Sequence, residues 1–224
     1  MINNIIDVFK NVDILEGIVD TLLMVIIATF IAYLLGTFLG VIMVCTDQKG
    51  IMPNRIVNFL IGLIVNLGRS IPFIILLIAL IPFTRFIVGT SLGVRGMVVP
   101  LSIGAIPFVA RLVESSLKEV DQGVIDAAIT MGCPKLQIVF KVYLREAVPS
   151  LIRGISITMI TLVGYSAMSG TVGGGGLGDI AIVNGYYNFD KYIMFVVIIV
   201  IIILVQIIQV IFDLIVKKID RKNI

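Results

Sequence analysis

The chain has 224 residues, of which 59% are hydrophobic and 14% charged, with a formal net charge of +3. Soluble globular chains carry roughly 25% charged residues, so the composition excludes a water-soluble globular fold and predicts an all-α integral membrane protein. Histidine, the commonest metal ligand and general base, is absent. Cys45 and Cys133 lie far apart in the sequence and each is close to a segment that we expect in the cytoplasm, so a disulfide framework is not expected. No nucleic-acid partner is expected, because the Lys and Arg residues cluster at the ends of the spans, where membrane orientation explains them.

The first apolar run, residues 18–45, is predicted to be a membrane span, because a bilayer needs about 20 apolar residues per helix. Residues 1–17 carry Asp7, Asp13 and Glu16 against a single Lys10, and they lack the apolar core and cleavage site of a signal peptide. We therefore expect an extracytoplasmic N-terminal segment and a first span that stays in the mature protein. Small residues recur at every fourth position on one face of this span: Ala28, Ala32, Gly36 and Gly40. Such a face suits close helix packing, and packing inside one subunit is the simpler interpretation than a dimer seam.

The second predicted span, residues 56–83, is interrupted at residues 66–72. Pro72 cannot donate a backbone hydrogen bond and tends to bend a helix. Arg69 is costly in a bilayer unless it faces protein or water. Two interpretations stay open: Arg69 lines a polar pathway, or it marks a helix end within a broken segment.

The third predicted span, residues 96–117, contains Pro100 and Pro107. Neighbouring helices must satisfy the carbonyls that these prolines leave free, so this helix should be buried in a bundle. Arg111 and Glu114 are three residues apart near its end and can pair, most simply as an interfacial ion pair.

The segment 118–146 is basic and follows the third span. Its apolar residues recur at helical spacing in two stripes, so we expect two amphipathic helices. Gly132 permits a turn between them, and Pro134 suits the first position of a new helix. A lipid-bound amphipathic helix is the alternative to docking on a partner protein. The stripes are Leu117, Val120, Val124, Ala128 and Met131, then Leu136, Val139, Phe140, Tyr143 and Leu144.

The last two predicted spans are residues 147–168 and 191–216. The first of them is rich in Ser, Thr and Gly, so it should line a water-filled pathway or pack tightly against other helices. Between them, residues 169–190 contain four consecutive glycines and are expected to form a flexible external connector. Residues 217–224 form a basic tail.

The positions of Lys and Arg near span ends predict the orientation. The segments 46–55 and 118–146 and the C-terminus are basic, whereas the N-terminus and the glycine-rich loop are poor in Lys and Arg. Five spans with the N-terminus outside and the C-terminus in the cytoplasm place all three basic segments inside. Residues 84–95, with two arginines, are the exception.

A resemblance to a known family rests on the basic segment. Asp126-Ala127-Ala128, three residues, then Gly132, and later Val142-x-Leu144, resemble the coupling-loop motif of ABC importer permeases, written EAA, three residues, G, nine residues, I-x-L-P. Asp126 stands where Glu is usual, and Arg145 stands where the motif has Pro. The stretches 69–73 and 166–178 are similar to the methionine-importer permeases, and the resemblance covers nearly the whole chain. The coupling motif is specific for the superfamily, whereas methionine rests on overall likeness.

This resemblance implies a type I ABC importer permease fold over residues 18–216, with five transmembrane helices. It implies a homodimer with two cytoplasmic ABC ATPase subunits and an extracytoplasmic substrate-binding protein, moving D- or L-methionine, or both, across the bacterial cytoplasmic membrane by alternating access. ATP and Mg²⁺ would be bound by the ATPase, because no Lys-Ser or Lys-Thr follows the glycines of this chain. The chain itself would be no enzyme and would hold no cofactor or metal.

The resemblance also implies three sets of functional residues. The ATPase-coupling set is Asp126, Ala127, Ala128, Gly132 and Pro134. The translocation-pathway set is Arg69, Ser70, Pro72, Thr158, Tyr165 and Ser166. The set facing the binding protein is Gly173, Gly174, Gly175, Gly176 and Asp179.

Other functions are weighed against this one. The same machinery could carry another amino acid or a small peptide. A stand-alone carrier without an ATPase would show inverted repeats, and five spans do not divide into two equal halves. A membrane scaffold would not need a polar fourth span or a broken second one. A membrane enzyme would need a carboxylate pair or a Ser–base arrangement, which no span offers.

Overall fold

The computed structural model describes residues 12–219, and all regular structure in that range is helical. The predicted segments 1–17 and 217–224 therefore lie largely outside the described residues. Four helices are long and apolar enough to cross a membrane, and a bent pair makes five if it counts as one span. The four are α2 (Ile14–Thr46), α6 (Gly93–Lys118), α10 (Val148–Ser169) and α12 (Lys191–Ile219).

The second predicted span is not one helix but a broken one. α3 (Arg55–Ser70) and α4 (Phe73–Ala79) meet at a 98° bend. Ile71 before the proline is extended, with φ −83° and ψ 123°, as expected for a residue that precedes proline. The short α5 (Ile81–Val88) then leads to α6. The predicted interruption of the span over residues 56–83 is therefore a sharp break, because α3 ends at Ser70 and Pro72 starts a new helix at a new angle.

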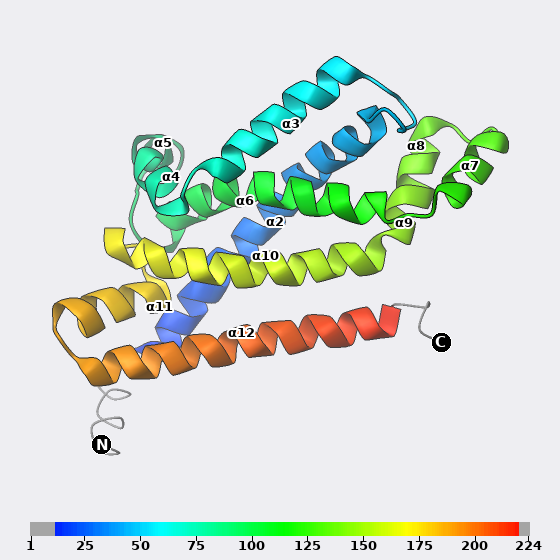
Figure 1. Ribbon diagram of the computed structural model, residues 1–224. Coiled ribbons are helices and arrows are strands. Elements are labelled where there is room, and N and C mark those ends of the chain that lie inside the picture. The colour runs from blue at the N-terminus through cyan, green and yellow to red at the C-terminus, as the bar shows by residue number, and fades with distance from the viewer. Residues whose placement is uncertain (1–11, 220–224) are drawn as a thin grey trace.

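Close packing of α2 against α6 forms the centre of the bundle, and α2 crosses behind α6 and α10 (Figure 1). A Cβ added at Gly36 would lie 2.7 Å from Val109 Cγ1, and one at Gly40 would lie 2.8 Å from the Ala110 carbonyl oxygen. The small-residue face of α2 thus packs inside one subunit, as predicted. Twelve residues of α6 are buried, Pro100 among them, which confirms the expectation of a helix enclosed by neighbours.

The basic segment folds as a compact helical hairpin at one end of the bundle (Figure 1). It comprises α7 (Gln122–Thr130), α8 (Lys135–Gln137), the π-helix η1 (Ile138–Tyr143) and α9 (Leu144–Glu146). The predicted helix–turn–helix is therefore present.

The glycine-rich segment lies at the opposite end of the bundle (Figure 1). It contains the 3₁₀ turn η2 (Gly170–Val172), α11 (Gly176–Asp179) and the π-helix η3 (Ile180–Tyr187). Gly174 and Gly176 to Gly178 are buried. The expectation of a flexible connector is wrong, because the absence of side chains lets this backbone pack directly onto α2 and α10.

Candidate functional site

The turn of the basic hairpin depends on Gly132, whose φ is +74°. Its N–H donates to the Ile129 carbonyl at 2.9 Å, and the Cys133 N–H donates to the Ala128 carbonyl at 3.1 Å. A residue with a Cβ is strained at this positive φ. Pro134 follows as the N-cap of α8, so Gly132 and Pro134 set the angle between the two arms.

The inner side of the hairpin is a small apolar core. Ile125 and Ala128 from α7 are buried with Ile138, Val139 and Tyr143 from η1. The predicted stripe on α7 is wrong by one position, because Val124 is exposed and Ile125 is buried in its place. In the second stripe Val139 and Tyr143 are buried, whereas Leu136 and Phe140 are exposed and Ile138 is buried in addition. The two arms are therefore held together without a partner.

The outer side of the hairpin exposes large apolar side chains. Met131 is 75% exposed, Leu136 71% and Phe140 65%. Lys135 and Lys141 are exposed in the same arm. Exposed apolar patches that are bordered by polar residues mark interaction surfaces. We call Met131, Leu136 and Phe140 the hairpin edge.

Asp126 and Ala127 are exposed on α7, whereas Ala128 is buried. The Asp126 carboxylate accepts a hydrogen bond from Gln122 Nε2 at 3.0 Å, and its carbonyl accepts one from Thr130 Oγ1 at 2.8 Å. The carboxylate has no ion-pair partner among residues 12–219. Asp126 and Ala127, which were predicted to belong to a coupling motif, are thus accessible at the surface of the subunit.

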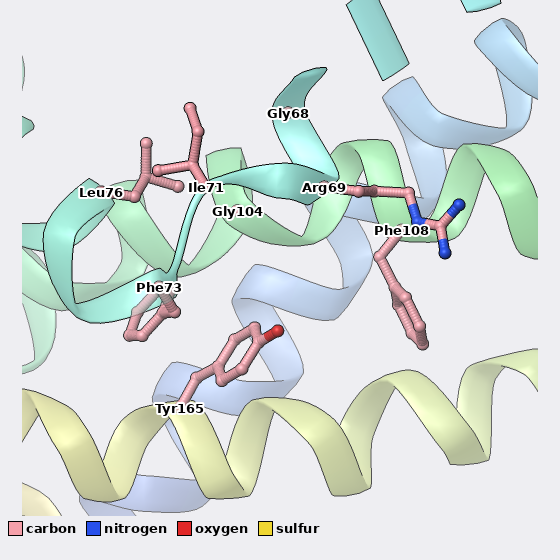
Figure 2. A pocket seen from close by; sticks show the side chains of 8 residues that line it. All are labelled: Gly68, Arg69, Ile71, Phe73, Leu76, Gly104, Phe108 and Tyr165. Atoms are coloured by element: carbon pink, nitrogen blue, oxygen red, sulfur yellow. The ribbon is translucent and has the colours of Figure 1, made fainter. Parts of the chain in front are cut away.

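The break in the second span forms one wall of a pocket of about 170 Å³. Figure 2 shows the residues that line it: Gly68, Arg69, Ile71, Phe73, Leu76, Gly104, Phe108 and Tyr165. Phe73 stacks on Tyr165 with ring centroids 4.4 Å apart and planes 3° apart. Gly68 lets α3 approach Pro107, and Gly104 lets α6 approach Phe73. The pocket thus joins α3, α4, α6 and α10.

Arg69 occupies the last turn of α3 and also lines this pocket. Arg69 therefore marks a helix end, and its place on a transport pathway stays a prediction. Its side chain is exposed, and within residues 12–219 it has no hydrogen-bond or ion-pair partner. The Tyr165 hydroxyl also lacks a hydrogen-bond partner in that range. In Figure 2 this hydroxyl points away from Phe73, toward the side where Arg69 and Phe108 lie.

Four other residues of the predicted pathway do not line the pocket. The Ser70 hydroxyl donates to the Asn66 carbonyl at 2.8 Å, and Pro72 acts through the bend. Thr158 and Ser166 are 0% and 2% exposed, and their hydroxyls donate to carbonyls of their own helix. Both lie in the packed interior of the subunit, because the exposed face of α10 is a different one. That face carries Arg153, Ile157, Gly164 and Met168.

Phe73, Gly104 and Phe108 are pocket residues that the sequence did not single out. Phe73 adjoins the Arg69–Pro72 break, which was a usable signal. Gly104 and Phe108 share one face of α6 at i and i+4, but apolar residues at that spacing occur throughout a membrane helix. Only the packing of α6 against α4 assigns them to the pocket.

Arg111 and Glu114 pair as predicted, at 2.5 Å, but as part of a longer polar network. Glu114 also accepts from Lys118 Nζ at 2.9 Å, and Lys118 reaches Asp47 at 2.9 Å. Arg111 donates to Asn66 Oδ1 on α3 at 2.8 Å. Glu114 is only 7% exposed, so the pair is not merely interfacial. The hydrogen bond from Lys118 lowers the pKa of Asp47. The network ties α3 and α6 to the loop after α2.

The glycine-rich segment is anchored to α2. The Leu177 N–H donates to Thr21 Oγ1 at 2.9 Å, and a Cβ at Gly176 would lie 2.6 Å from the same oxygen.

Asp179 lines a hollow beside this contact, together with acidic residues from the start of α2. Its Oδ1 is buried without a hydrogen-bond partner among residues 12–219, and burial raises the pKa of its carboxyl. No group of residues in that range could hold a metal ion.

Proteins of known sequence resemble the chain over most of its length. The family model described as "Binding-protein-dependent transport system inner membrane component" matches residues 32–223. The "Probable D-methionine transport system permease protein MetI" of Vibrio cholerae is 50% identical over 203 residues, 91% of this chain and 90% of that protein. The "D-methionine transport system permease protein MetI" of Escherichia coli K12 is 48% identical over 155 residues, 69% of this chain and 71% of that protein.

Solved structures agree with this relationship. A MetNI methionine ABC transporter in an inward-facing conformation has a TM-score of 0.91 and 45% identity, covering 93% of this chain and 96% of that chain. An amino acid ABC transporter solved with histidines has a TM-score of 0.74 at 18% identity, covering 92% and 93%, and shares the fold alone. The family match and the identity to its relatives extend over the pocket and the hairpin alike, so this chain belongs to the family of binding-protein-dependent transport system inner membrane components.

Proposed function

We propose that the chain is the permease subunit of an ATP-driven ABC importer that moves methionine, in the D form, the L form or both, across the bacterial cytoplasmic membrane. The observation that carries this proposal is the helical hairpin around Asp126 and Gly132, which presents an exposed apolar edge at one end of a membrane bundle. Relatives with 47–50% identity are described as D-methionine permeases, which supports methionine as the substrate.

The hairpin is proposed to dock on a cytoplasmic ATPase. Its own core holds the two arms rigid, so a force applied to the hairpin edge is passed to α6 and α10, which flank it in the chain. Its basic character supports a cytoplasmic position. The glycine-rich segment would then lie outside, at the opposite end of the bundle, with the N-terminus. There Gly173 to Gly176 and Asp179 are proposed to face the substrate-binding protein.

The pathway is proposed to run between two copies of this chain. The described part of one subunit leaves polar groups such as Arg69 and Tyr165 on an open pocket, although a charge at membrane depth must face protein or water. A second copy would close that space. Thr158 and Ser166 would support this wall from behind, and Ser70 and Pro72 would shape the break.

Transport follows as alternating access. ATP and Mg²⁺, held by the ATPase partners, would close the ATPase pair and draw the two docked hairpins together. Each subunit would rock as a rigid body, since its helices are closely packed at Gly36 and Gly40. The pocket would open outward to receive substrate, and hydrolysis would return it to the cytoplasmic side.

A pull-down tests this proposal. The tagged chain is extracted from its own host in mild detergent, and stoichiometric partners are identified by mass. Gly132→Arg should lose a co-purified ATPase and methionine uptake while still inserting in the membrane. Gly132→Asn is the matched control, because Asn tolerates positive φ and no atom lies within 4 Å of a Cβ there. Normal uptake by well-expressed Gly132→Arg would contradict the role of the hairpin.

The substrate is tested separately. Expression of the chain with its partners should restore growth of a strain that lacks methionine uptake, on D- or L-methionine. Rescue by another amino acid, without rescue by methionine, would favour the same machinery with a different substrate.

A further inference from the structure

The pocket at the break of the second span contains an unpaired cation in a largely apolar setting. Arg69 and the Tyr165 hydroxyl are its two polar side-chain groups, and neither has a hydrogen-bond partner among residues 12–219. The remaining lining side chains are aromatic or aliphatic, apart from two glycines, and none is acidic. The pocket therefore offers hydrogen-bond donors and a positive charge, but no carboxylate.

The position of Arg69 along α3 indicates how deep its charge lies in a bilayer. α3 begins at Arg55, and at 1.5 Å per residue Arg69 lies about 21 Å further along the helix. The hydrocarbon core of a bilayer is about 30 Å thick, so a helix that enters the bilayer at Arg55 places the Arg69 guanidinium within it. An ionised side chain at this depth marks a functional site by default, and its partner must be sought. The described part of the chain supplies none.

The size and shape of the pocket suit a small solute. Its volume of about 170 Å³ is below the roughly 300–1,000 Å³ of pockets that take drug-sized ligands. The stacked rings of Phe73 and Tyr165 form one wall, and Phe108 lies beside Arg69 (Figure 2). Aromatic faces attract thioether sulfur as well as hydrocarbon. A guanidinium matches a carboxylate with two parallel hydrogen bonds.

We propose that this pocket is a binding station for the free α-carboxylate of an amino acid with an apolar side chain, held by Arg69 and the Tyr165 hydroxyl, with the side chain against Phe73 and Phe108. This inference rests on the proposed function, which it deepens by naming the recognised group. The ammonium of the substrate meets no carboxylate from this subunit. Within this subunit it faces the aromatic and aliphatic side chains of the pocket.

The station therefore recognises one end of the substrate and not the other. A ligand that keeps the carboxylate and the thioether but lacks the ammonium should bind nearly as well as methionine. A ligand that keeps the ammonium but lacks the carboxylate should bind poorly. Because the pocket binds only the carboxylate of the polar groups, it does not select the configuration of the α-carbon, and both enantiomers of methionine should bind.

The test measures binding of radiolabelled L-methionine to the permease–ATPase complex in nanodiscs, without the substrate-binding protein. The competitors are 4-(methylthio)butanoate, which lacks the ammonium, and methioninol, which lacks the carboxylate. The butanoate should compete within about threefold of methionine, and methioninol at least about tenfold more weakly, the factor expected for a charge-assisted hydrogen bond. Arg69→Gln should lower methionine affinity about tenfold or more and abolish the difference between the competitors.

Two further variants make the result specific. Arg95→Gln removes the same charge from an exposed arginine on α6 that does not line the pocket, and it should leave binding and discrimination unchanged. Tyr165→Phe keeps the stacked ring but loses the hydroxyl, so it should weaken methionine binding by a smaller factor than Arg69→Gln. Light scattering reports whether each complex keeps its subunit composition.

The outcomes separate this inference from the proposed function. If Arg69→Gln binds methionine with unchanged affinity and still discriminates between the competitors, the proposed binding station is wrong. It is also wrong if this variant alone loses subunits, because Arg69 would then serve the contact with the second copy of the chain. Absence of methionine binding by the wild-type complex, with uptake intact when the binding protein is added, would also overturn it and leave the proposed function standing. Failure of wild-type uptake would instead contradict the proposed function.

Discussion

The close approach of α2 and α6 at Gly36 makes Gly36→Ala a sharp test of the bundle. The added Cβ would lie 2.7 Å from Val109 Cγ1 and 3.1 Å from the Ala110 nitrogen. Carbon atoms in contact normally lie about 3.5–4.0 Å apart, so the helices must separate by about 1 Å or Val109 must leave its rotamer. Overpacking of this kind lowers the free energy of unfolding by about 1–3 kcal/mol.

Gly62→Ala is the matched control. Gly62 lies in the interior of α3, and nothing lies within 4 Å of a Cβ added there. Replacing a helical glycine with alanine stabilises a helix by about 0.8–1 kcal/mol, and both variants share that gain. The difference between them therefore isolates the clash, about 1–3 kcal/mol in favour of Gly62→Ala.

Unfolding can be followed through Cys45, a free cysteine that is 3% exposed. A thiol-reactive fluorophore labels it only when α2 leaves the bundle, and Cys133→Ser removes the background of the second thiol. Each variant is heated in detergent, and the unfolding temperatures are compared. A Gly36→Ala protein that unfolds at or above the temperature of Gly62→Ala would refute the packing of α2 on α6 at this distance.

Three further predictions address other parts of the chain. Phe140→Ser on the hairpin edge should weaken ATPase binding about tenfold, because docking would bury a ring that is 65% exposed; affinity is measured with immobilised complex components. Glu114→Gln should lower the free energy of unfolding by about 2 kcal/mol in the thiol assay, because Arg111 and Lys118 lose a charged acceptor. Asp179→Asn should raise the unfolding temperature at neutral pH and lose this advantage below about pH 4.

The sign for Asp179 follows from its raised pKa. The folded protein holds this proton more tightly than the unfolded chain, so the carboxyl favours folding at low pH and loses that effect as the pH rises through its folded pKa. An advantage of Asn that is equal at pH 4 and pH 7 would contradict the burial of the charge.

The other two predictions have matched controls. Phe86→Ser, on the 88% exposed ring of α5, is the control for Phe140→Ser and should leave ATPase affinity unchanged. Glu146→Gln, at an exposed position, is the control for Glu114.

The sequence predicted the hairpin correctly in outline and incorrectly in detail. Gly132 and Pro134 act locally, so the turn and the two arms could be placed from residue chemistry alone. Ile125 is buried on α7 in place of the predicted Val124, and the second arm contains a π-helical turn that no local pattern revealed. Met131 and Phe140, which belong to the predicted stripes, are exposed.

The pathway residues show the opposite case. Of the residues predicted for the pathway, Arg69 and Tyr165 line the pocket, whereas Thr158 and Ser166 do not. A Ser or Thr in a membrane helix can face a polar path or bond to its own backbone, and the sequence is the same in both cases. The direction of each side chain depends on which face of α10 packs against α2 and α6.

The sequence by itself determined the membrane class, the all-helical fold and the helix–turn–helix segment around Gly132. These depend on composition, on helical periodicity and on residues that act within a few positions, all of which are local properties. Only the tertiary structure decided that the chain bends by 98° between α3 and α4, that Arg69 shares a pocket with Phe108 and Tyr165 (Figure 2), and that Gly176 packs against Thr21. Those features arise from contacts between helices far apart in the chain, and the pocket exists only where several such contacts meet.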